Sequence, residues 1–278
     1  MSYKLQILIS TMYKTNLSFL EPIFKKNNHY SSYNILIVNQ TDKGRLLISE
    51  YENIKVINSF ERGSPASRNL AITKSTGDIC LMADDDFVYE ANFDQKIIDA
   101  HKNNPNADFI SFEAIDENGE LYAKYHNVSV HNKKSLKRIY TCVITFKREP
   151  FVRSRTFFNH YFGVGSLFQG VTEYVFLRNA YDNGMSMYHE HKIIVIHLDK
   201  SSGRRQGSDN AFFARSAAAY RFMGNLSYLW LLKYTLFTIR HKYIKINDAL
   251  AKFRIGLNGI SKYKDLERSG DIDKIYEY

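Results

Sequence analysis

Short apolar segments that end in polar residues alternate with helical patterns through the first part of the chain, and this alternation constrains the fold more than any other feature. Apolar residues show helical spacing at 17–26 and again at 64–76, where Gly77 is placed to end the helix. Strands that alternate with helices at this spacing favour an α/β fold with a mostly parallel sheet covered on both faces. The predicted strands are LQILIS (5–10), NILIVN (34–39), NIKVINS (53–59) and DICLMA (78–83).

The α/β pattern continues to about residue 200 and then changes. Segment 117–138 is polar and basic without clear periodicity, which predicts loops and edge strands over the sheet. We expect two regions, an α/β domain over 1–200 and a basic, mainly helical region over 201–278. Further strands are predicted at 108–116, 139–147 and 192–199, with helices at 92–107, at 172–185 and across 211–253.

Composition narrows the class of protein. No run of about 18 apolar residues is present to span a bilayer, and the apolar part of KLQILISTMY is too short for a signal-peptide core, so we expect a cytoplasmic protein. Cys80 and Cys142 lie in apolar segments without metal-ligand spacing, which predicts buried, reduced thiols. The net charge of +9 lies mostly in the C-terminal region, since residues 200–278 hold 15 of the 38 basic residues and only 7 of the 29 acidic ones.

Three consecutive carboxylates, Asp84, Asp85 and Asp86, follow the apolar segment at 78–83 directly. Ligands of parallel α/β sheets bind beyond the carboxyl ends of the strands, which is where this triplet falls. Three adjacent negative charges raise one another's pKa unless a cation lies among them, and carboxylate oxygens suit Mg²⁺ or Mn²⁺. The triplet therefore predicts a divalent metal site; a solvated, helix-capping turn is the alternative.

The order of these motifs resembles the family 2 glycosyltransferases, whose fold is of the GT-A type. The resemblance covers about residues 4–200, and its most specific part is an Arg-Asn pair on a helix followed by Gly-Asp, an apolar strand and the acidic triplet. It implies a metal-dependent transfer of a sugar from a nucleotide-sugar donor. The segments that carry it are ILISTMY, ILIVNQTDKG, GSPASRNLAITKSTGDICLMADDDF, TEYVFLRNAYDNG and IIVIH.

The resemblance also assigns residues to the nucleotide. Thr11 and Tyr13 would line the pocket, with Tyr13 near the base. Asn39 and Gln40 stand where the family usually has an acidic residue that binds uracil, and the Gln40 amide can still pair with a uracil edge. Arg68 matches an arginine at the nucleotide end, and its guanidinium suits either a phosphate or a carboxylate.

The metal site follows from the same resemblance. Asp84 and Asp85 would contact the donor, and Asp84 and Asp86 would bind Mn²⁺ or Mg²⁺. His197, at the end of IIVIH, resembles a histidine that completes the metal site in many GT-A enzymes. A metal that bridges the two phosphates would neutralise the charge on the departing nucleoside diphosphate. A purely structural role is the alternative for His197.

The family's catalytic base is the second acid of a Glu-Asp pair that opens a helix after a Gly-rich turn. Here FGVGSLFQG precedes VTEYVFL, so Thr172 and Glu173 occupy that pair. Glu173 would deprotonate the acceptor hydroxyl for attack opposite the phosphate, which implies inversion at the anomeric carbon. A favourable interaction with the helix dipole is the alternative role for Glu173.

Two features beyond residue 200 complete the predictions. Arg204 and Arg205 lie between Gly203 and Gly207, which favours a lid over the diphosphate, with a solvated loop as the alternative. The segment 226–246 mixes Leu, Trp and Phe with Lys and Arg, which predicts either an amphipathic helix at a membrane surface or a helix packed on the α/β domain.

Together these observations predict an inverting glycosyltransferase that uses a UDP-sugar and a glycan or lipid-linked acceptor in surface polysaccharide synthesis. A nucleic-acid-binding protein is an alternative from the sequence pI of 9.3, but the predicted binding edge ends in Asp instead of Lys or Arg, so we expect no nucleic-acid partner. A non-catalytic carbohydrate-binding or scaffold protein of the same fold is the other alternative, because Thr172 and Asn39 depart from the family pattern.

Overall fold

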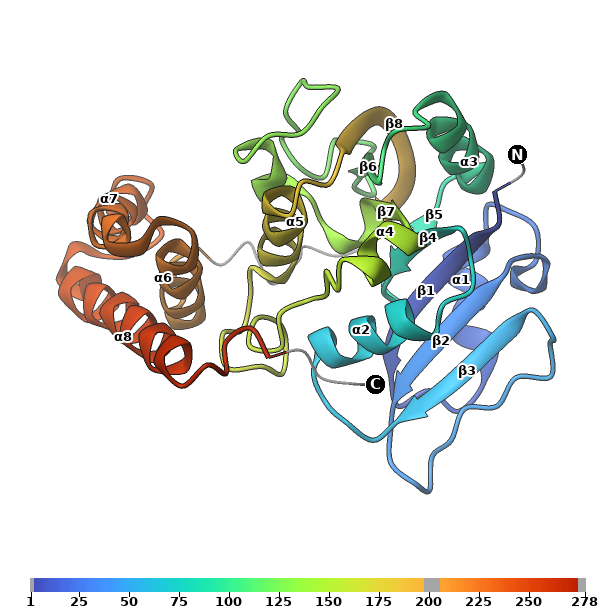
Figure 1. The fold of residues 1–278 in the computed structure, drawn as a ribbon, viewed down its shortest axis with the longest axis horizontal. Coiled ribbons are helices and arrows are strands. Elements are labelled where there is room, and N and C mark those ends of the chain that lie inside the picture. Colours follow the sequence, from blue (N-terminus) through green and yellow to red (C-terminus); the bar gives the residue numbers. More distant parts are fainter. Residues whose placement is uncertain (1–2, 198–205, 275–278) are drawn as a thin grey trace.

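The predicted α/β fold is confirmed, with an eight-stranded sheet at its centre (Figure 1). The computed structural model describes residues 3–197 and 206–274. The strands are β1 (Leu5–Met12), β2 (Ile35–Gln40), β3 (Ile54–Ser59), β4 (Ile79–Ala83), β5 (Phe87–Tyr89), β6 (Phe109–Ile115), β7 (Ile144–Lys147) and β8 (Met187–His197). The α-helices are α1 (Leu20–Phe24), α2 (Ser64–Lys74), α3 (Phe93–Asn103), α4 (Arg148–Arg153), α5 (Thr172–Asp182), α6 (Asp209–Met223), α7 (Ser227–Arg240) and α8 (Ala249–Arg268).

The sheet has a parallel half and a mixed half, in the order β3-β2-β1-β4-β7-β6-β8-β5. β1 pairs in parallel with β2 and β4, and β2 with β3, as the alternation of strands and helices predicts. On the other side β7 lies antiparallel to both β4 and β6, β6 pairs in parallel with β8, and β5 lies antiparallel to β8. The carboxyl ends of β1, β2 and β4 therefore meet at one edge.

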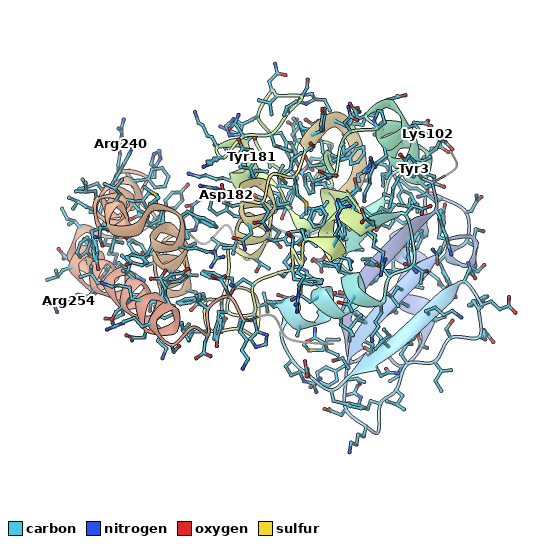
Figure 2. All side chains as sticks on the ribbon, viewed as in Figure 1. Tyr3, Lys102, Tyr181, Asp182, Arg240 and Arg254 are labelled. Atoms are coloured by element: carbon cyan, nitrogen blue, oxygen red, sulfur yellow. The ribbon has the colours of Figure 1, made fainter. Side chains whose placement is uncertain are left out.

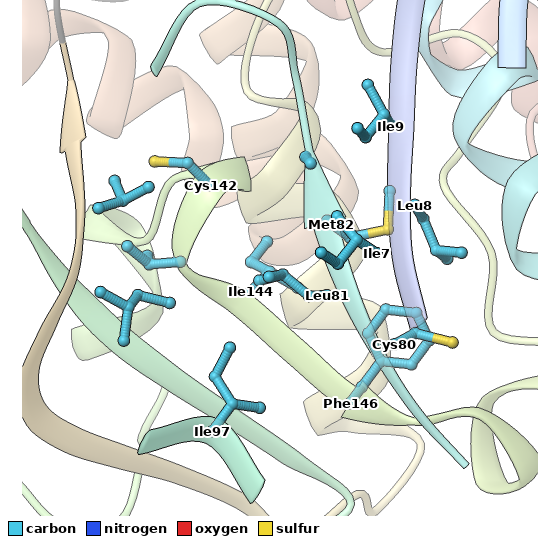
Figure 3. Close-up of a cluster of buried hydrophobic side chains, with 14 of the residues drawn as sticks. Ile7, Leu8, Ile9, Cys80, Leu81, Met82, Ile97, Cys142, Ile144 and Phe146 are labelled. Atoms are coloured by element: carbon cyan, nitrogen blue, oxygen red, sulfur yellow. The ribbon is translucent and has the colours of Figure 1, made fainter. Parts of the chain in front are cut away.

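Helices and sheet share one large apolar core. Helix α2 packs against β1 and β2, α1 packs against β5, and α3 packs against β8. Figure 3 shows part of this core, where Ile7 of β1 lies beside Leu81 of β4 and Leu8 lies beside Met82. Cys80 and Cys142 are free and buried in the same core, as the sequence predicts.

Several element predictions need correction. The segment predicted as a strand over 139–147 begins with a helical turn, Thr141–Val143, and only Ile144–Lys147 pairs in the sheet. The last strand begins at Met187, earlier than predicted, and β5 and α4 were not predicted. Segment 117–138 contributes isolated bridges instead of edge strands.

Gly77 does not end α2, because the helix stops at Lys74 and Ser75 caps it. Its role is close packing: a Cβ atom on Gly77 would lie 2.6 Å from the Cβ of Gln6, at the start of β1. The Gln6 side chain also accepts a hydrogen bond of 3.1 Å from the Gly77 amide. The glycine thus lets the chain pass tightly over β1 before it enters β4.

The C-terminal helices form a separate layer beyond α5 (Figure 1). Helices α6 and α8 pack on each other and contribute to an apolar cluster that includes Phe162, Phe168 and Val175 of the α/β domain. Figure 2 shows Arg240 of α7 and Arg254 of α8 extending outward from this layer. Within the described residues, no helix combines the length and apolar character that crossing a bilayer requires.

Candidate active site

Polar side chains collect at the edge where β1, β2 and β4 end. Thr11 of β1 lies opposite Asn39 of β2, and the triplet that starts at Asp84 follows β4 directly. The sequence placed these residues at the carboxyl edge of the parallel strands, and the structure confirms that location.

Asp85 is held by the loop that follows β1. Its Oδ2 accepts a hydrogen bond of 2.6 Å from the Thr11 hydroxyl and lies 2.8 Å from the Lys14 ammonium. Lys14 was not among the predicted site residues, although it follows Tyr13 directly. Asp85 thus faces β1, away from the partners of Asp84.

Arg68 connects two parts of the site. Its Nη2 donates to both carboxylate oxygens of Asp84 at 3.1 Å, and its Nη1 donates to Glu173 Oε1 at 3.1 Å. The side chain is only 7% exposed. Burial alone would lower the pKa of Arg68, but Asp84 and Glu173 raise it above its usual value, so the guanidinium stays charged. The carboxylate-binding alternative predicted for Arg68 is therefore what the structure contains.

The Gly-rich turn fixes the distance between α2 and α5. Gly163 has a φ of 148°, and a Cβ there would lie 2.7 Å from the Ser64 hydroxyl and 2.9 Å from Pro65. The Ser64 amide also donates to the Val164 carbonyl at 2.9 Å. A residue larger than glycine would push the turn away from the start of α2, and with it the helix that carries Glu173.

Glu173 lies in the first turn of α5, where negative charge is favourable. Its Oε1 accepts hydrogen bonds from Arg68 and, at 2.5 Å, from the hydroxyl of Thr141. Its Oε2 makes no hydrogen bond within the described residues, and the side chain is 26% exposed. Glu173 is thus fixed through one oxygen while the other can accept a proton. Thr172, in the position of the missing family acid, is buried.

The charges around Asp84 favour a cation. Burial raises the pKa of Asp84, Arg68 lowers it in part, and Asp86 and Glu173 raise it further. Asp86 is exposed and makes no ion pair within the described residues. The edge thus holds four carboxylates, those of Asp84, Asp85, Asp86 and Glu173, and the side-chain cations paired with them are Arg68 and Lys14. A divalent ion therefore fits both the excess negative charge and the oxygen ligands available.

His197 reaches the triplet through strand pairing. Phe87, which follows Asp86, pairs with His197 across β5 and β8. The His197 imidazole stacks on Tyr122, with ring centres 4.4 Å apart, while Asp84 faces Arg68. Among the described residues, Asp84, Asp86 and His197 do not form a group whose ligand atoms all lie within 4.8 Å of one another. Metal binding by Asp84, Asp86 and His197 stays a prediction.

Tyr13 lies beside two cationic side chains, Arg45 and Arg62, which were not among the predicted site residues. It has a φ of 57° and is 38% exposed. The guanidinium carbons of Arg62 and Arg45 lie 4.9 Å and 5.3 Å from its ring centre. Arg62 also pairs with Asp42 at 2.5 Å. An exposed ring beside two guanidinium groups can take a base and a phosphate.

Gln40 and Asn39 have structural partners. Gln40 is buried, accepts a hydrogen bond of 2.8 Å from the Gly63 amide and donates one of 3.3 Å to Ser67. Asn39 is also buried and holds the backbone of Lys14 through two hydrogen bonds. Both amides therefore fix the loops around the edge, and uracil binding by Gln40 stays a prediction. Arg204 and Arg205 lie outside the described residues.

Comparisons with known proteins bear on the family and the fold. The model of the family described as glycosyl transferase family 2 matches residues 11–163. Among solved structures, TarS of S. aureus (residues 1–349) is similar with a TM-score of 0.51 and 12% identity, over 99% of this chain and 93% of that one. A longer TarS structure gives a TM-score of 0.57 and 13% identity, over 97% of this chain and 53% of that one. The structure of TarS 1–349 in complex with UDP gives a TM-score of 0.52 and 11% identity, over 99% of this chain and 94% of that one. A search of curated proteins finds no match.

Proposed function

The chain belongs to glycosyl transferase family 2, and on that basis we propose that it transfers a sugar from a UDP-sugar to a hydroxyl group of a glycan or lipid-linked acceptor in surface polysaccharide synthesis. The observation that carries this proposal is the contact of Arg68 with both Asp84 and Glu173. It joins the acidic edge, where the donor diphosphate would lie, to the carboxylate that would act on the acceptor. A carbohydrate-binding scaffold has no need of that connection.

Glu173 acts as the general base in this proposal. Its Oε2 accepts the proton of the acceptor hydroxyl while that oxygen attacks the anomeric carbon and the bond to the diphosphate breaks. Arg68 and Thr141 hold the other oxygen, which orients the carboxylate. Attack from the side opposite the diphosphate inverts the anomeric configuration.

Asp86, with Asp84 and His197, would hold Mn²⁺ or Mg²⁺, which neutralises charge on the departing diphosphate when bound. The support for this is the excess of carboxylates over cations at the edge and the raised pKa of Asp84. Asp85 has a different role, since its contacts with Thr11 and Lys14 fix the loop that carries Tyr13.

Tyr13, Arg45 and Arg62 would bind the nucleotide end of the donor, with the ring against the base and the guanidinium groups near phosphate. For Arg204 and Arg205, which lie outside the described residues, contact with the diphosphate stays a prediction from the sequence. TarS, which has a similar fold, is known in complex with UDP and with UDP-GlcNAc. That similarity is the reason to test UDP-sugars first.

The acceptor part of the proposal includes attachment to the inner face of the cell membrane through α7. Leu229, Leu232 and Leu236 share one face of that helix and are 67%, 50% and 59% exposed. Exposed basic residues lie nearby, at Lys233, Arg240, Lys242 and Lys245. Apolar side chains flanked by cations bind anionic lipid surfaces, where a lipid-linked acceptor would lie.

Release of UDP from a panel of UDP-sugars, with Mn²⁺ present and water as the acceptor of the sugar, tests the proposed activity. We expect one donor to give turnover in the full-length protein and the Asp86→Asn variant to be at least about 100-fold slower, the scale of losing a key electrostatic group. Glu52→Gln, an exposed carboxylate away from the edge, serves as the control and should keep the wild-type rate. No turnover with any donor, or the same rate in Asp86→Asn as in Glu52→Gln and the wild type, would contradict the proposal.

A further inference from the structure

A second group of potential metal ligands lies on β6 and β8, which run side by side (Figure 1). Ligand atoms of Glu113, His189 and His191 all lie within 4.8 Å of one another. Glu113 Oε1 is 2.9 Å from His191 Nδ1 and 3.5 Å from His189 Nε2. The group contains two imidazoles and one carboxylate, a combination that binds zinc and similar transition metals.

An irregularity in strand pairing brings these residues together. Ser111 lies opposite His189, but Glu113 lies opposite Ile193, so β8 uses four residues where β6 uses two. Such bulges redirect side chains and are common beside functional sites. Here the extra residues allow His189 and His191, both on one face of β8, to approach the same carboxylate.

His189 carries an unsatisfied nitrogen. Its side chain is 1% exposed, and its Nε2 has no hydrogen-bond partner within the described residues. The separation of 3.5 Å from Glu113 is longer than a normal N–H···O hydrogen bond. A buried polar atom without a partner is costly, and this one points at a carboxylate oxygen.

A chain of close polar contacts orients the His189 ring. His131 Nδ1 lies 2.9 Å from the Ser135 hydroxyl, and His131 Nε2 lies 2.8 Å from the Ser111 hydroxyl. The Ser111 hydroxyl also lies 2.7 Å from His189 Nδ1. Nδ1 of His189 is thus engaged by Ser111, and Nε2 is the ring nitrogen that faces Glu113.

His189 Nε2 and Glu113 Oε1 therefore face each other in a buried position without a hydrogen bond between them. When Nδ1 carries the ring proton, Nε2 presents a lone pair, which is the form of the ring that binds a metal. A cation between the two atoms would satisfy both of them.

We propose that His189 Nε2, Glu113 and His191 bind one divalent transition metal of the zinc class, with a fourth position open to solvent on the side of His191. The His191 side chain is 44% exposed, which gives the ion a path to the buried ligands. Ser111 and His131 act as the outer hydrogen bonds that orient His189. Three protein ligands with one open position is an arrangement known from zinc sites.

This site is separate from the acidic edge. Between the positions opposite His189 and Ile196, β6 advances four residues, from Ser111 to Ile115, which corresponds to about 13 Å of strand, and His197 lies one residue further along β8. An ion at Glu113 would therefore not reach a diphosphate at Asp86. Its effect would be to hold β6 and β8 together and, through Ser111 and His131, to fix the segment that precedes β7.

Titration with Co²⁺ tests the proposal on the full-length protein after removal of metal by a chelator. We expect the visible absorption bands of a low-symmetry cobalt site to saturate at one Co²⁺ per chain, in the wild type and in Asp86→Asn, so that an ion at the acidic edge is not counted. One Zn²⁺ should displace this Co²⁺, and Zn²⁺ addition should raise the melting temperature. His191→Ala should weaken binding by at least about tenfold, and Ser111→Ala by about tenfold through loss of the outer hydrogen bond.

His241→Ala is the matched control, because that histidine is also exposed and lies in the C-terminal helices. It should bind Co²⁺ as the wild type does, and so should Asp86→Asn at the acidic edge. Circular dichroism confirms folding of each variant before titration. Absence of a one-to-one cobalt signal in the wild type, or equal affinity in His191→Ala and wild type, would overturn the proposal.

Discussion

The guanidinium of Arg68 lies 3.1 Å from Glu173 and 3.1 Å from Asp84, although these partners are 105 and 16 residues away in the sequence. One buried side chain thus connects the end of β4 with the start of α5. Each carboxylate limits the freedom of the other through this shared cation.

Replacement Arg68→Lys removes this connection, because an ammonium group lacks the planar fork that reaches two carboxylates at once. We expect kcat/KM for the transfer reaction to fall by about 10- to 100-fold, the scale of misplacing a reacting group by about 1 Å. Arg68→Ala should also lower the free energy of unfolding by about 3 kcal/mol, since two carboxylates lose their partner. Urea unfolding and steady-state kinetics measure both, with the exposed Arg153→Lys as control. Wild-type kinetics in Arg68→Lys would show that the connection is not needed.

Replacement Glu173→Gln keeps the size of the side chain and its Oε1 acceptor but removes the basic oxygen. We expect kcat to fall by about 10²- to 10⁴-fold, the usual contribution of a general base, while the KM for the donor changes little. Glu149→Gln, an exposed carboxylate on α4, is the control. If Glu173→Gln loses donor affinity and keeps kcat, its role is structural.

The proposed membrane attachment would depend on the exposed leucines of α7. We expect the wild type to float with anionic vesicles and the triple change of Leu229, Leu232 and Leu236 to Ser to reduce the bound fraction by at least about tenfold. Ile48→Ser, which removes a 77% exposed apolar residue from the α/β domain, should bind normally. Neutral vesicles should bind the wild type less than anionic ones. Equal flotation of the triple variant and wild type would refute attachment through this helix.

Stability should fall at acid pH because of the buried His101. Burial, with a smaller contribution from Lys147, lowers the pKa of His101 from 6.5 to about 3, so the unfolded chain binds a proton there at a pH where the folded chain does not. The stabilisation is complete above pH 6.5 and is lost as the pH falls toward 3. Between pH 7 and pH 5 we expect the wild type to lose about 2 kcal/mol more than His101→Gln in urea unfolding. An identical loss in the two proteins would contradict this origin.

The sequence predicts the parallel half of the sheet well, because each of its strands is an apolar run bounded by polar residues. It predicts the other half less well. β5 has only three residues, Phe87–Tyr89, too few to show a period, and Thr141–Val143 is apolar enough to be taken for a strand. Gly77 was assigned to a helix end because a single sequence does not show that its α-carbon passes over Gln6.

The candidate site was also predicted only in part from the sequence. Residues at the carboxyl ends of strands, such as Thr11 within β1 and Asp84 after β4, could be located because parallel strands end at one edge. The contacts of Arg68 with Glu173 and of Thr141 with Glu173 depend on how distant segments pack, which no local pattern reveals. The alternate spacing of His189 and His191 places both on one strand face and can be read from the sequence, but Glu113 joins them only through the bulge.

Binding of UDP, measured by titration calorimetry with and without Mn²⁺, tests the central claim most directly: the acidic edge holds a cation that binds the diphosphate. We predict that Mn²⁺ tightens UDP binding by at least about tenfold, equivalent to about 1.4 kcal/mol, in the wild type and in His191→Ala but not in Asp86→Asn. The same UDP affinity with and without Mn²⁺ in the wild type, or a full effect of Mn²⁺ in Asp86→Asn, would contradict it.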